Sequence, residues 1–293
     1  MDMLDATVVV PTYNDWEGVQ RCLDALANQS LAPSRFEVVV ANNNQEPAPP
    51  SGLRLPPNAL IVHVQQPGSY AARNAALVHA KGRVVFFTDG DCLPERDWLD
   101  VGLSLMQGRA PLDRVAGAVE FTKKGAEWTA VELYDSLHWM KQAEYAAAGW
   151  AATSNLVVFK RAFDLVGPFR TDLYSGGDRE WGERASAVGG TIAFAPGLRI
   201  RHPARATLAA LVRKQRRVDG ARFLRERKHG WRLYAPPLRR MLPSIRATRR
   251  LLRMNELDLF RRLQLCGISW LLRAVVVLER TRLAYSSRHA VRD

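Results

Sequence analysis

The sequence predicts an α/β fold with a mainly parallel central sheet, followed by a basic helical extension. Short apolar, β-branched runs alternate with helical patterns through the first two thirds of the chain, which is typical of βαβ units. Polar residues follow several of these runs at the point where each strand ends. Positive charge is concentrated in the last third. These three observations together predict a ligand-binding α/β domain joined to a chemically different segment.

The charge distribution separates the two parts. The chain has 293 residues, 47% of them hydrophobic and 24% charged, with a formal net charge of +13. Residues 1–198 carry 17 Lys and Arg against 23 Asp and Glu, whereas residues 199–293 carry 25 against 6. The basic excess therefore predicts an anionic partner only for the last third. We place the boundary at residue 205, with a catalytic domain over 1–205 and an arginine-rich helical extension over 206–293.

The expected elements follow in chain order. The first strands are predicted at 7–10, 36–41, 60–64 and 83–88, with helices at 15–28 and 69–80. The later strands are predicted at 114–120, 155–159, 191–195 and 198–201, with helices at 127–148, 160–166 and 178–188 and from 206 onward. In such sheets ligands bind beyond the carboxyl ends of the strands, so those ends are the expected site.

The cellular context is predicted from cysteines and from the N-terminus. Three cysteines lie far apart without metal-ligand spacing, which favours a reducing compartment. The acidic N-terminus passes directly into a strand, with no secretory signal pattern. The longest apolar stretch, 263–278, is interrupted by Arg273 and is short for a membrane span. We therefore expect a cytoplasmic protein.

A pair of carboxylates ends the fourth strand. Asp89 and Asp91 are separated by Gly90, and residues i and i+2 of an extended segment point to the same side. Two converging carboxylates favour a divalent cation such as Mn²⁺ or Mg²⁺. A solvated turn after a strand is the alternative from this fragment alone.

Several motifs occur together in a characteristic order. They include VVVPTYND (8–15), QPGSYAARNAAL (66–77), FFTDGDCLP (86–94) and SGGDREWGERASAVGG (175–190). The ordered set resembles the family 2 glycosyltransferases, which have the GT-A fold, over roughly residues 5–205. The resemblance implies transfer of a sugar from a nucleotide-diphosphate sugar to an acceptor hydroxyl, with a divalent metal and inversion of the anomeric centre.

The resemblance assigns donor contacts to two strand ends. Pro11, Thr12 and Tyr13 match the family's contact with the nucleoside. Asn42 and Asn43 stand where the family usually has an acidic residue that reads the base. An amide can also hydrogen-bond a base edge, but this departure weakens the expectation of uracil.

The same resemblance predicts the diphosphate and metal contacts. Arg73 and Asn74 match the family's Ala-Arg-Asn near the base and the diphosphate, or else lie on a charged helix face. Asp91 is expected to bind the metal, and Asp89 the ribose, the metal or both. His202 follows the last strand and is expected to reach the metal or the diphosphate, the alternative being a solvated surface histidine.

Asp178 is the base that the resemblance predicts, with Glu180 in reserve. Helix capping is the alternative role for both residues. Gly177 replaces a frequent acidic neighbour of the base. The residues expected on the acceptor side are Trp150, Asn155, Gly176, Gly177 and Trp181.

The C-terminal extension contains a helical pattern around 262–280. Arg262, Cys266, Ser269, Arg273, Val276 and Arg280 form one stripe at helical spacing, and leucines and Trp270 occupy the other faces. Such a helix can lie in a membrane interface, and the segment 238–253 adds further arginine. The apolar side could instead pack on the catalytic domain or on a second subunit, leaving the arginines solvated. No aromatic-basic motif of an RNA-binding module is present.

The sequence therefore predicts a metal-dependent inverting glycosyltransferase of the hexosyltransferase type. Its acceptor is expected to be a glycan or a lipid-linked precursor in the synthesis of a cell-surface polysaccharide, at an anionic membrane surface. One alternative is a nucleotidyltransferase. Another is a non-catalytic protein that binds membrane or nucleic acid through the basic tail, although strand-end carboxylates disfavour nucleic acid in the cleft. The sequence makes no prediction of the oligomeric state.

Overall fold

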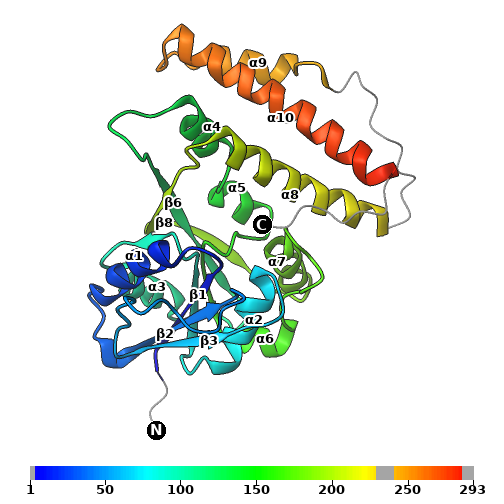
Figure 1. Cartoon of the computed structure of the whole chain (residues 1–293). Helices are drawn as coiled ribbons and strands as arrows, with labels where there is room; N and C mark the ends of the chain where they lie inside the picture. Colours follow the sequence, from blue (N-terminus) through cyan, green and yellow to red (C-terminus); the bar gives the residue numbers. More distant parts are fainter. Residues whose placement is uncertain (1–3, 229–240, 286–293) are drawn as a thin grey trace. The chain divides into compact units, whose positions relative to one another are not determined.

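The structure is a computed structural model that describes residues 4–228 and 241–285, and it divides into two compact units (Figure 1). The first unit takes the described residues up to Thr122, Met140–Leu173 and Gly177–Pro203. The second unit takes Lys123–Trp139, Tyr174–Gly176 and the described residues from Ala204 onward. Residues 123–139 thus group with the C-terminal helices, although they precede the expected boundary at 205.

The first unit contains the sheet and the helices around it. Its strands are β1 Ala6–Thr12, β2 Phe36–Asn42, β3 Ala59–His63, β4 Val84–Thr88, β5 Leu93–Pro94, β6 Arg114–Thr122, β7 Asn155–Phe159 and β8 Ile192–Pro203. Its helices are α1 Trp16–Ala27, the short 3₁₀ helix η1 Pro33–Arg35, α2 Ser69–His79, α3 Trp98–Met106, α5 Gln142–Ala147, α6 Arg161–Val166 and α7 Gly177–Ala187.

The sheet is mostly parallel, as the sequence predicts. Its strand order is β3-β2-β1-β4-β7-β6-β8-β5. β1 pairs in parallel with β2 and β4, so the carboxyl ends of these three strands meet at one edge, with Thr12 opposite Asn42. β7 runs antiparallel to β4, with Asn155 opposite Thr88. The strands β1, β2 and β4 are almost wholly buried, which explains why they are apolar on both faces.

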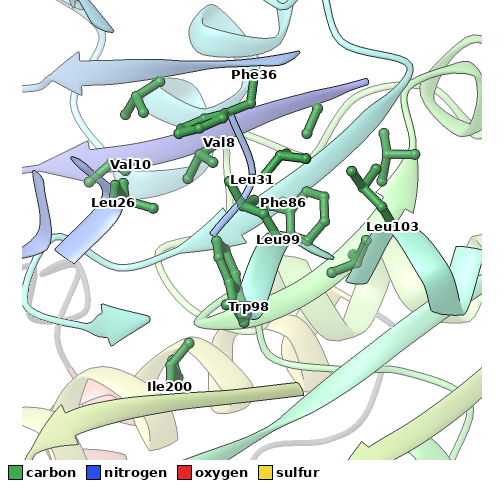
Figure 2. Packing of buried hydrophobic residues seen from close by; sticks show 14 of the residues in the cluster. Val8, Val10, Leu26, Leu31, Phe36, Phe86, Trp98, Leu99, Leu103 and Ile200 are labelled. Carbon is green, nitrogen blue, oxygen red and sulfur yellow. The ribbon is translucent and has the colours of Figure 1, made fainter. Parts of the chain in front are cut away.

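The core lies on both faces of the sheet. Figure 2 shows one cluster, in which Val8, Phe86 and Trp98 pack together with no exposed surface. The ring centroids of Phe86 and Trp98 are 4.9 Å apart. The Trp98 indole N–H donates to the side chain of Asn155 at 3.0 Å, so the polar atom of this buried ring has a partner. This packing fixes the strands whose ends carry the candidate site.

The expected helix over 127–148 is wrong in its continuity. The structure has two helices there, α4 Ala130–His138 in the second unit and α5 in the first. Thr129 and Glu132 form a capping box at the start of α4, and Met140 has a φ of 54°. A non-glycine residue in the left-handed conformation interrupts a helix. The helical spacing of the aromatic residues in the sequence therefore spans a break between α4 and α5. The two short strands expected at 191–201 form the single strand β8, with an irregular register after Gly117 of β6.

The second unit is helical. It comprises α4, α8 Leu208–Lys228, α9 Ile245–Leu252 and α10 Leu259–Tyr285. The buried cluster of this unit includes Tyr134, Leu211, Leu251 and Leu265. No helix among the described residues is long and apolar enough to cross a membrane. Residues 238–240, which open the expected basic segment 238–253, lie outside the described residues.

Candidate active site

Four side chains with metal-binding atoms meet where β4 and β8 end. Asp89, Asp91, Cys92 and His202 each present one such atom, and these atoms all lie within 4.8 Å of one another. The carboxylates converge through a turn, in which the backbone N–H of Cys92 donates to the carbonyl of Asp89 at 3.1 Å, rather than through the extended segment that the sequence analysis assumed. A Cβ at Gly90 would lie 3.0 Å from Val19 of α1 and 3.1 Å from the carbonyl of Pro11 in β1, so glycine lets this turn pack closely against both elements.

His202 is oriented for a ligand role. Its side chain is 4% exposed, so it is not the solvated surface histidine that its arginine neighbours suggested. Nδ1 donates to the carbonyl of Pro203 at 2.7 Å, which assigns the proton to Nδ1 and leaves the Nε2 lone pair free. Nε2 faces the Asp91 carboxylate at 3.8 Å. Two electron-pair donors facing each other in this way fit a shared cation.

Cys92 is a poor ligand for a hard cation. Its side chain is fully buried, and burial, with Asp91 and Asp89 nearby, raises the pKa of its thiol. The thiol therefore stays protonated at neutral pH, and a thiolate is the form that binds metals. The remaining set of two carboxylates and one imidazole suits Mn²⁺ or Mg²⁺ better than Zn²⁺.

Arg73 lies beside this cluster. Its guanidinium pairs with Asp89 at 2.5 Å, and its side chain is 4% exposed. Among the described residues its buried Nε has no hydrogen-bond partner, and the same holds for the hydroxyls of Thr12 and Thr88 at the ends of β1 and β4. Unpaired buried donors are costly, so their grouping at one sheet edge indicates a polar ligand. Tyr13 is half exposed at the same strand end, where a base could contact it.

The asparagines after β2 hold loops together. Asn42 is fully buried, and its amide donates to the carbonyls of Glu46 and Pro47 at 2.9 and 3.1 Å. Asn43 donates to the carbonyls of Val64 and Gln66, both at 2.8 Å. All the amide N–H donors of both residues are thus engaged, and a base contact through them would require these hydrogen bonds to break.

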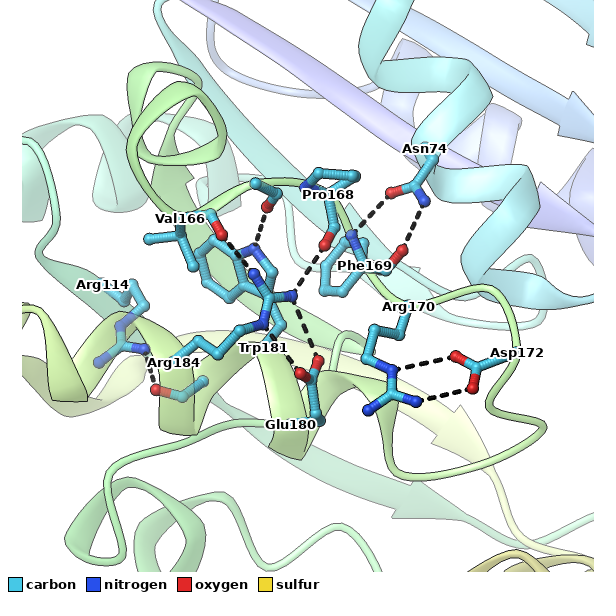
Figure 3. A network of polar contacts seen from close by, with 12 residues as sticks. Asn74, Arg114, Val166, Pro168, Phe169, Arg170, Asp172, Glu180, Trp181 and Arg184 are labelled. Atoms are coloured by element: carbon cyan, nitrogen blue, oxygen red, sulfur yellow. Dashed lines mark hydrogen bonds and ion pairs between the residues drawn. The ribbon is translucent and has the colours of Figure 1, made fainter. Parts of the chain in front are cut away.

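Asn74 also has a role that the sequence did not suggest. Its amide exchanges two hydrogen bonds with the backbone of Phe169, at 2.8 and 3.0 Å (Figure 3). The side chain therefore holds α2 to the segment after α6. These contacts give Asn74 a structural role, and its contact with the diphosphate stays a prediction.

Asp178 begins α7 and accepts two hydrogen bonds. The phenol of Tyr70 donates to Oδ1 at 3.1 Å, and the backbone N–H of Arg179 donates to the same atom at 2.9 Å. Burial is the main cause that raises the pKa of Asp178, whereas Arg73 and these hydrogen bonds oppose the rise. A carboxylate with a raised pKa is a stronger proton acceptor.

Tyr70 connects Asp178 to the acidic cluster. Its ring lies 5.9 Å from the guanidinium carbon of Arg73, which in turn pairs with Asp89. A Cβ at Gly177 would lie 2.8 Å from this ring, so the glycine makes room for Tyr70. The contact of Gly177 with an acceptor stays a prediction. Tyr70 was missed because a tyrosine among alanines in a helix reads as a core residue.

Glu180, the reserve base, is engaged elsewhere. Its carboxylate pairs with Arg184 at 2.9 Å (Figure 3). Arg184 also donates to the carbonyls of Val166 and Pro168, so it ties α7 to the end of α6. This leaves Asp178 as the better-placed base.

Two residues expected on the acceptor side belong to the core. Trp181 is fully buried, stacks on Phe163 and donates to the carbonyl of Gly167 at 2.8 Å (Figure 3). Asn155 is also fully buried and bonds the carbonyls of Ala118 and Leu198. Neither side chain can touch an acceptor without unfolding its surroundings, so both expectations are corrected.

The other two acceptor-side residues keep partial exposure. Trp150 stacks on Tyr145, with ring centroids 4.1 Å apart, and the Arg179 guanidinium lies 5.9 Å from its ring. Gly176 has a φ of +79°, a left-handed conformation that favours glycine. The left-handed backbone conformation thus explains why glycine occurs at position 176. The contact of Trp150 with an acceptor stays a prediction.

The sequence matches Glycosyl transferase family 2 over residues 7–164, which is more than half of the chain. The chain belongs to glycosyl transferase family 2. The matched region begins in β1 and includes the Asp89–Asp91 turn. The family membership confirms the glycosyltransferase prediction and decides against the nucleotidyltransferase and the non-catalytic binding protein.

Named relatives of this family 2 glycosyltransferase agree with the assignment. Glycosyltransferase AglE of Haloferax volcanii is 37% identical over 218 residues, which are 72% of this chain and 71% of AglE. The poly(ribitol-phosphate) beta-N-acetylglucosaminyltransferase TarS of Staphylococcus aureus is 33% identical over 94 residues, but these are 30% of this chain and only 16% of TarS.

Solved structures confirm the GT-A fold of this family 2 glycosyltransferase. The mannosyltransferase PcManGT of Pyrobaculum calidifontis, solved with GDP-Man and Mn²⁺, has a TM-score of 0.56 at 19% identity over 98% of this chain and 77% of PcManGT. TarS residues 1–349 with UDP have a TM-score of 0.54 at 15% identity over 99% of this chain and 95% of that one. At these identities the likeness is one of fold.

Proposed function

We propose that this protein is a divalent-metal-dependent, inverting hexosyltransferase that takes its sugar from a nucleotide-diphosphate sugar. The observation that carries the proposal is the convergence of Asp89, Asp91 and His202 beside the buried Arg73. Two solved structures of similar fold support the donor class, because PcManGT was solved with GDP-Man and TarS with UDP. The acceptor that we propose is the hydroxyl of a glycan or of a lipid-linked precursor.

Asp91 and His202 would hold Mn²⁺ or Mg²⁺, with Asp89 shared between the cation and Arg73. When bound, the cation would neutralise the diphosphate and stabilise its charge as a leaving group. Arg73 supplies a second, permanent positive charge at the same edge of the sheet. Thr12 and Tyr13, at the end of β1, are the side chains that we expect to contact the nucleoside.

Asp178 performs the proton transfer in this proposal. The acceptor oxygen forms a bond to the anomeric carbon while the bond from that carbon to the diphosphate oxygen breaks. The acceptor proton passes to the Asp178 carboxylate, and the electron pair of the broken bond leaves with the nucleoside diphosphate. Tyr70 holds Asp178 by its hydrogen bond, and attack from the face opposite the leaving group inverts the anomeric centre.

Titration calorimetry tests the donor site. UDP, GDP, dTDP and CDP are each titrated with Mn²⁺ and with EDTA into the native protein, into Asp91→Ala and into the control Asp97→Asn. Asp97 is an exposed acid that precedes α3 and makes no side-chain cap there. We expect one diphosphate to bind only with Mn²⁺ and only when Asp91 is present. Binding that is equal in EDTA, or equal in Asp91→Ala, would contradict the metal role.

A further inference from the structure

The second unit exposes a long uncharged stripe on α10. The stripe is formed by Leu259, Phe260, Leu263, Gly267, Trp270, Leu271, Leu278 and Tyr285, which are all exposed. At 100° per residue these positions fall on one face of the helix, which at 1.5 Å per residue extends for about 40 Å. The exposed fractions of Leu263 and Leu278 are 54% and 57%. A continuous apolar face of this length indicates a binding surface.

The arginines of α10 lie on its other side. Arg280 pairs with Asp219 of α8 at 2.7 Å, and Arg262 donates to the carbonyls of Leu257 and Leu252. The alternative in which the apolar side packs away and leaves the arginines solvated does not fit these contacts. The helix satisfies these charges inside the second unit and exposes the leucines of the stripe, whereas Leu265, Leu272 and Leu283 are buried. Burial within the unit does not account for these exposed residues, which makes the stripe a candidate for contact with a partner.

A row of unpaired arginines runs along the neighbouring helix α9. Arg246, Arg249, Arg250 and Arg253 are exposed and, together with Ile245, line a hollow of about 550 Å³. Among the described residues none of these four side chains makes a hydrogen bond or an ion pair. α9 is joined to the stripe, because the Trp270 indole N–H donates to the Thr248 hydroxyl at 3.1 Å.

We infer that this stripe and this arginine row together bind the surface of an anionic lipid bilayer. An apolar helix face with adjacent cations is the arrangement that enters the headgroup region in the plane of a membrane. Basic residues near such a surface are attracted to its anionic headgroups. A second copy of the chain fits less well, since packing two stripes together would bring two unbalanced arginine rows close.

Vesicle flotation tests the inference independently of catalysis, because it needs neither donor nor metal. The full chain is floated with vesicles of phosphatidylcholine alone and with vesicles that also contain phosphatidylglycerol. We expect flotation with the anionic vesicles and its loss in high salt. Leu263→Glu/Leu278→Glu is expected to weaken partitioning about tenfold or more. Arg249→Gln/Arg250→Gln is expected to abolish the preference for phosphatidylglycerol.

Val78→Glu is the matched control, since Val78 is an 80% exposed apolar residue on α2 of the first unit. It should float as the native protein does, and all variants should keep the native melting midpoint. The inference is overturned if the native protein does not float with anionic vesicles or if Val78→Glu loses flotation equally. It is also overturned if the native protein is a dimer that Leu263→Glu/Leu278→Glu dissociates without any vesicle binding. A protein that floats but binds no diphosphate would contradict the proposed function alone.

Discussion

At the scale of single residues, the pair formed by Tyr70 and Asp178 controls the proposed proton transfer. Burial raises the pKa of Asp178, while the Tyr70 hydrogen bond and the Arg73 charge limit that rise. Burial also raises the pKa of Tyr70, so its phenol stays protonated and remains a donor. The proposed base is therefore held in place by a neutral partner rather than by a salt bridge.

We expect Tyr70→Phe to lower kcat about tenfold, because the carboxylate loses one of its two hydrogen-bond donors. The same loss raises the pKa of Asp178 further, so the acidic limb of the kcat profile should move to higher pH. The KM for the donor should not change. Steady-state kinetics across pH measure both effects, with Tyr285→Phe as a control outside the site. An unchanged acidic limb would remove Tyr70 from the positioning role.

Asp178→Asn should raise thermal stability while it abolishes transfer. The pKa of Asp178 in the folded protein lies above its ordinary value of 3.8, so the folded state binds protons more tightly than the unfolded state. The protonated form of Asp178 therefore contributes fully to the free energy of unfolding below pH 3.8. That contribution is lost as the pH rises through the pKa of the folded protein. At pH 7 the uncharged amide is therefore expected to raise the melting midpoint, because it removes the cost of keeping a buried charge. A lower midpoint at pH 7 would contradict the assignment.

At the scale of elements, the end of β2 depends on a network of three asparagines. Asn44 accepts the backbone N–H of Asn14, and its own amide N–H donates to Asn42 at 2.7 Å. Asn43 links the ends of β2 and β3 to Gly68, which precedes α2. The network therefore holds together the loops that carry the strand-end site. It also explains why polar residues follow an entirely buried strand.

Asn43→Ala distinguishes the structural role of Asn43 in joining these loops from a role in recognising the nucleotide base. It removes hydrogen bonds to Val64, Gln66 and Gly68, and we expect a loss of about 2–3 kcal/mol in the free energy of unfolding. All nucleoside diphosphates should then bind more weakly by a similar factor. Denaturant unfolding and calorimetry measure the two effects. Asn28→Ala, which removes one exposed hydrogen bond at the end of α1, is the control. Altered base selectivity at unchanged stability would restore the base-reading role.

At the scale of the whole molecule, the second unit is built from two separate stretches of chain. Its core joins Tyr134 of α4 to Leu211, Leu251 and Leu265 of the C-terminal helices. Asp135 of the same helix is fully buried and pairs with Arg205 at 3.2 Å. A cut in the sequence at residue 205 therefore does not separate the two units.

A chain that ends at residue 205 is expected to aggregate. It would keep α4 but lose the leucines that bury Tyr134, so an apolar surface would face water. Binding of a hydrophobic dye and light scattering measure the effect. Tyr134→Ser in the shortened chain should reduce dye binding. A shortened chain that stays monomeric and binds no dye would support the boundary expected from composition.

The sequence by itself determined the fold class, the family and the positions of the carboxylates. These features depend on local sequence patterns, because each apolar strand and the Asp89–Asp91 turn is encoded by a few adjacent residues. Only the tertiary structure decided what each side chain contacts. Trp181 entered the core, and α10 turned its arginines inward, because packing partners far away in the sequence fix those orientations. The pairing of Tyr70 with Asp178 joins residues 108 positions apart, which no local pattern encodes.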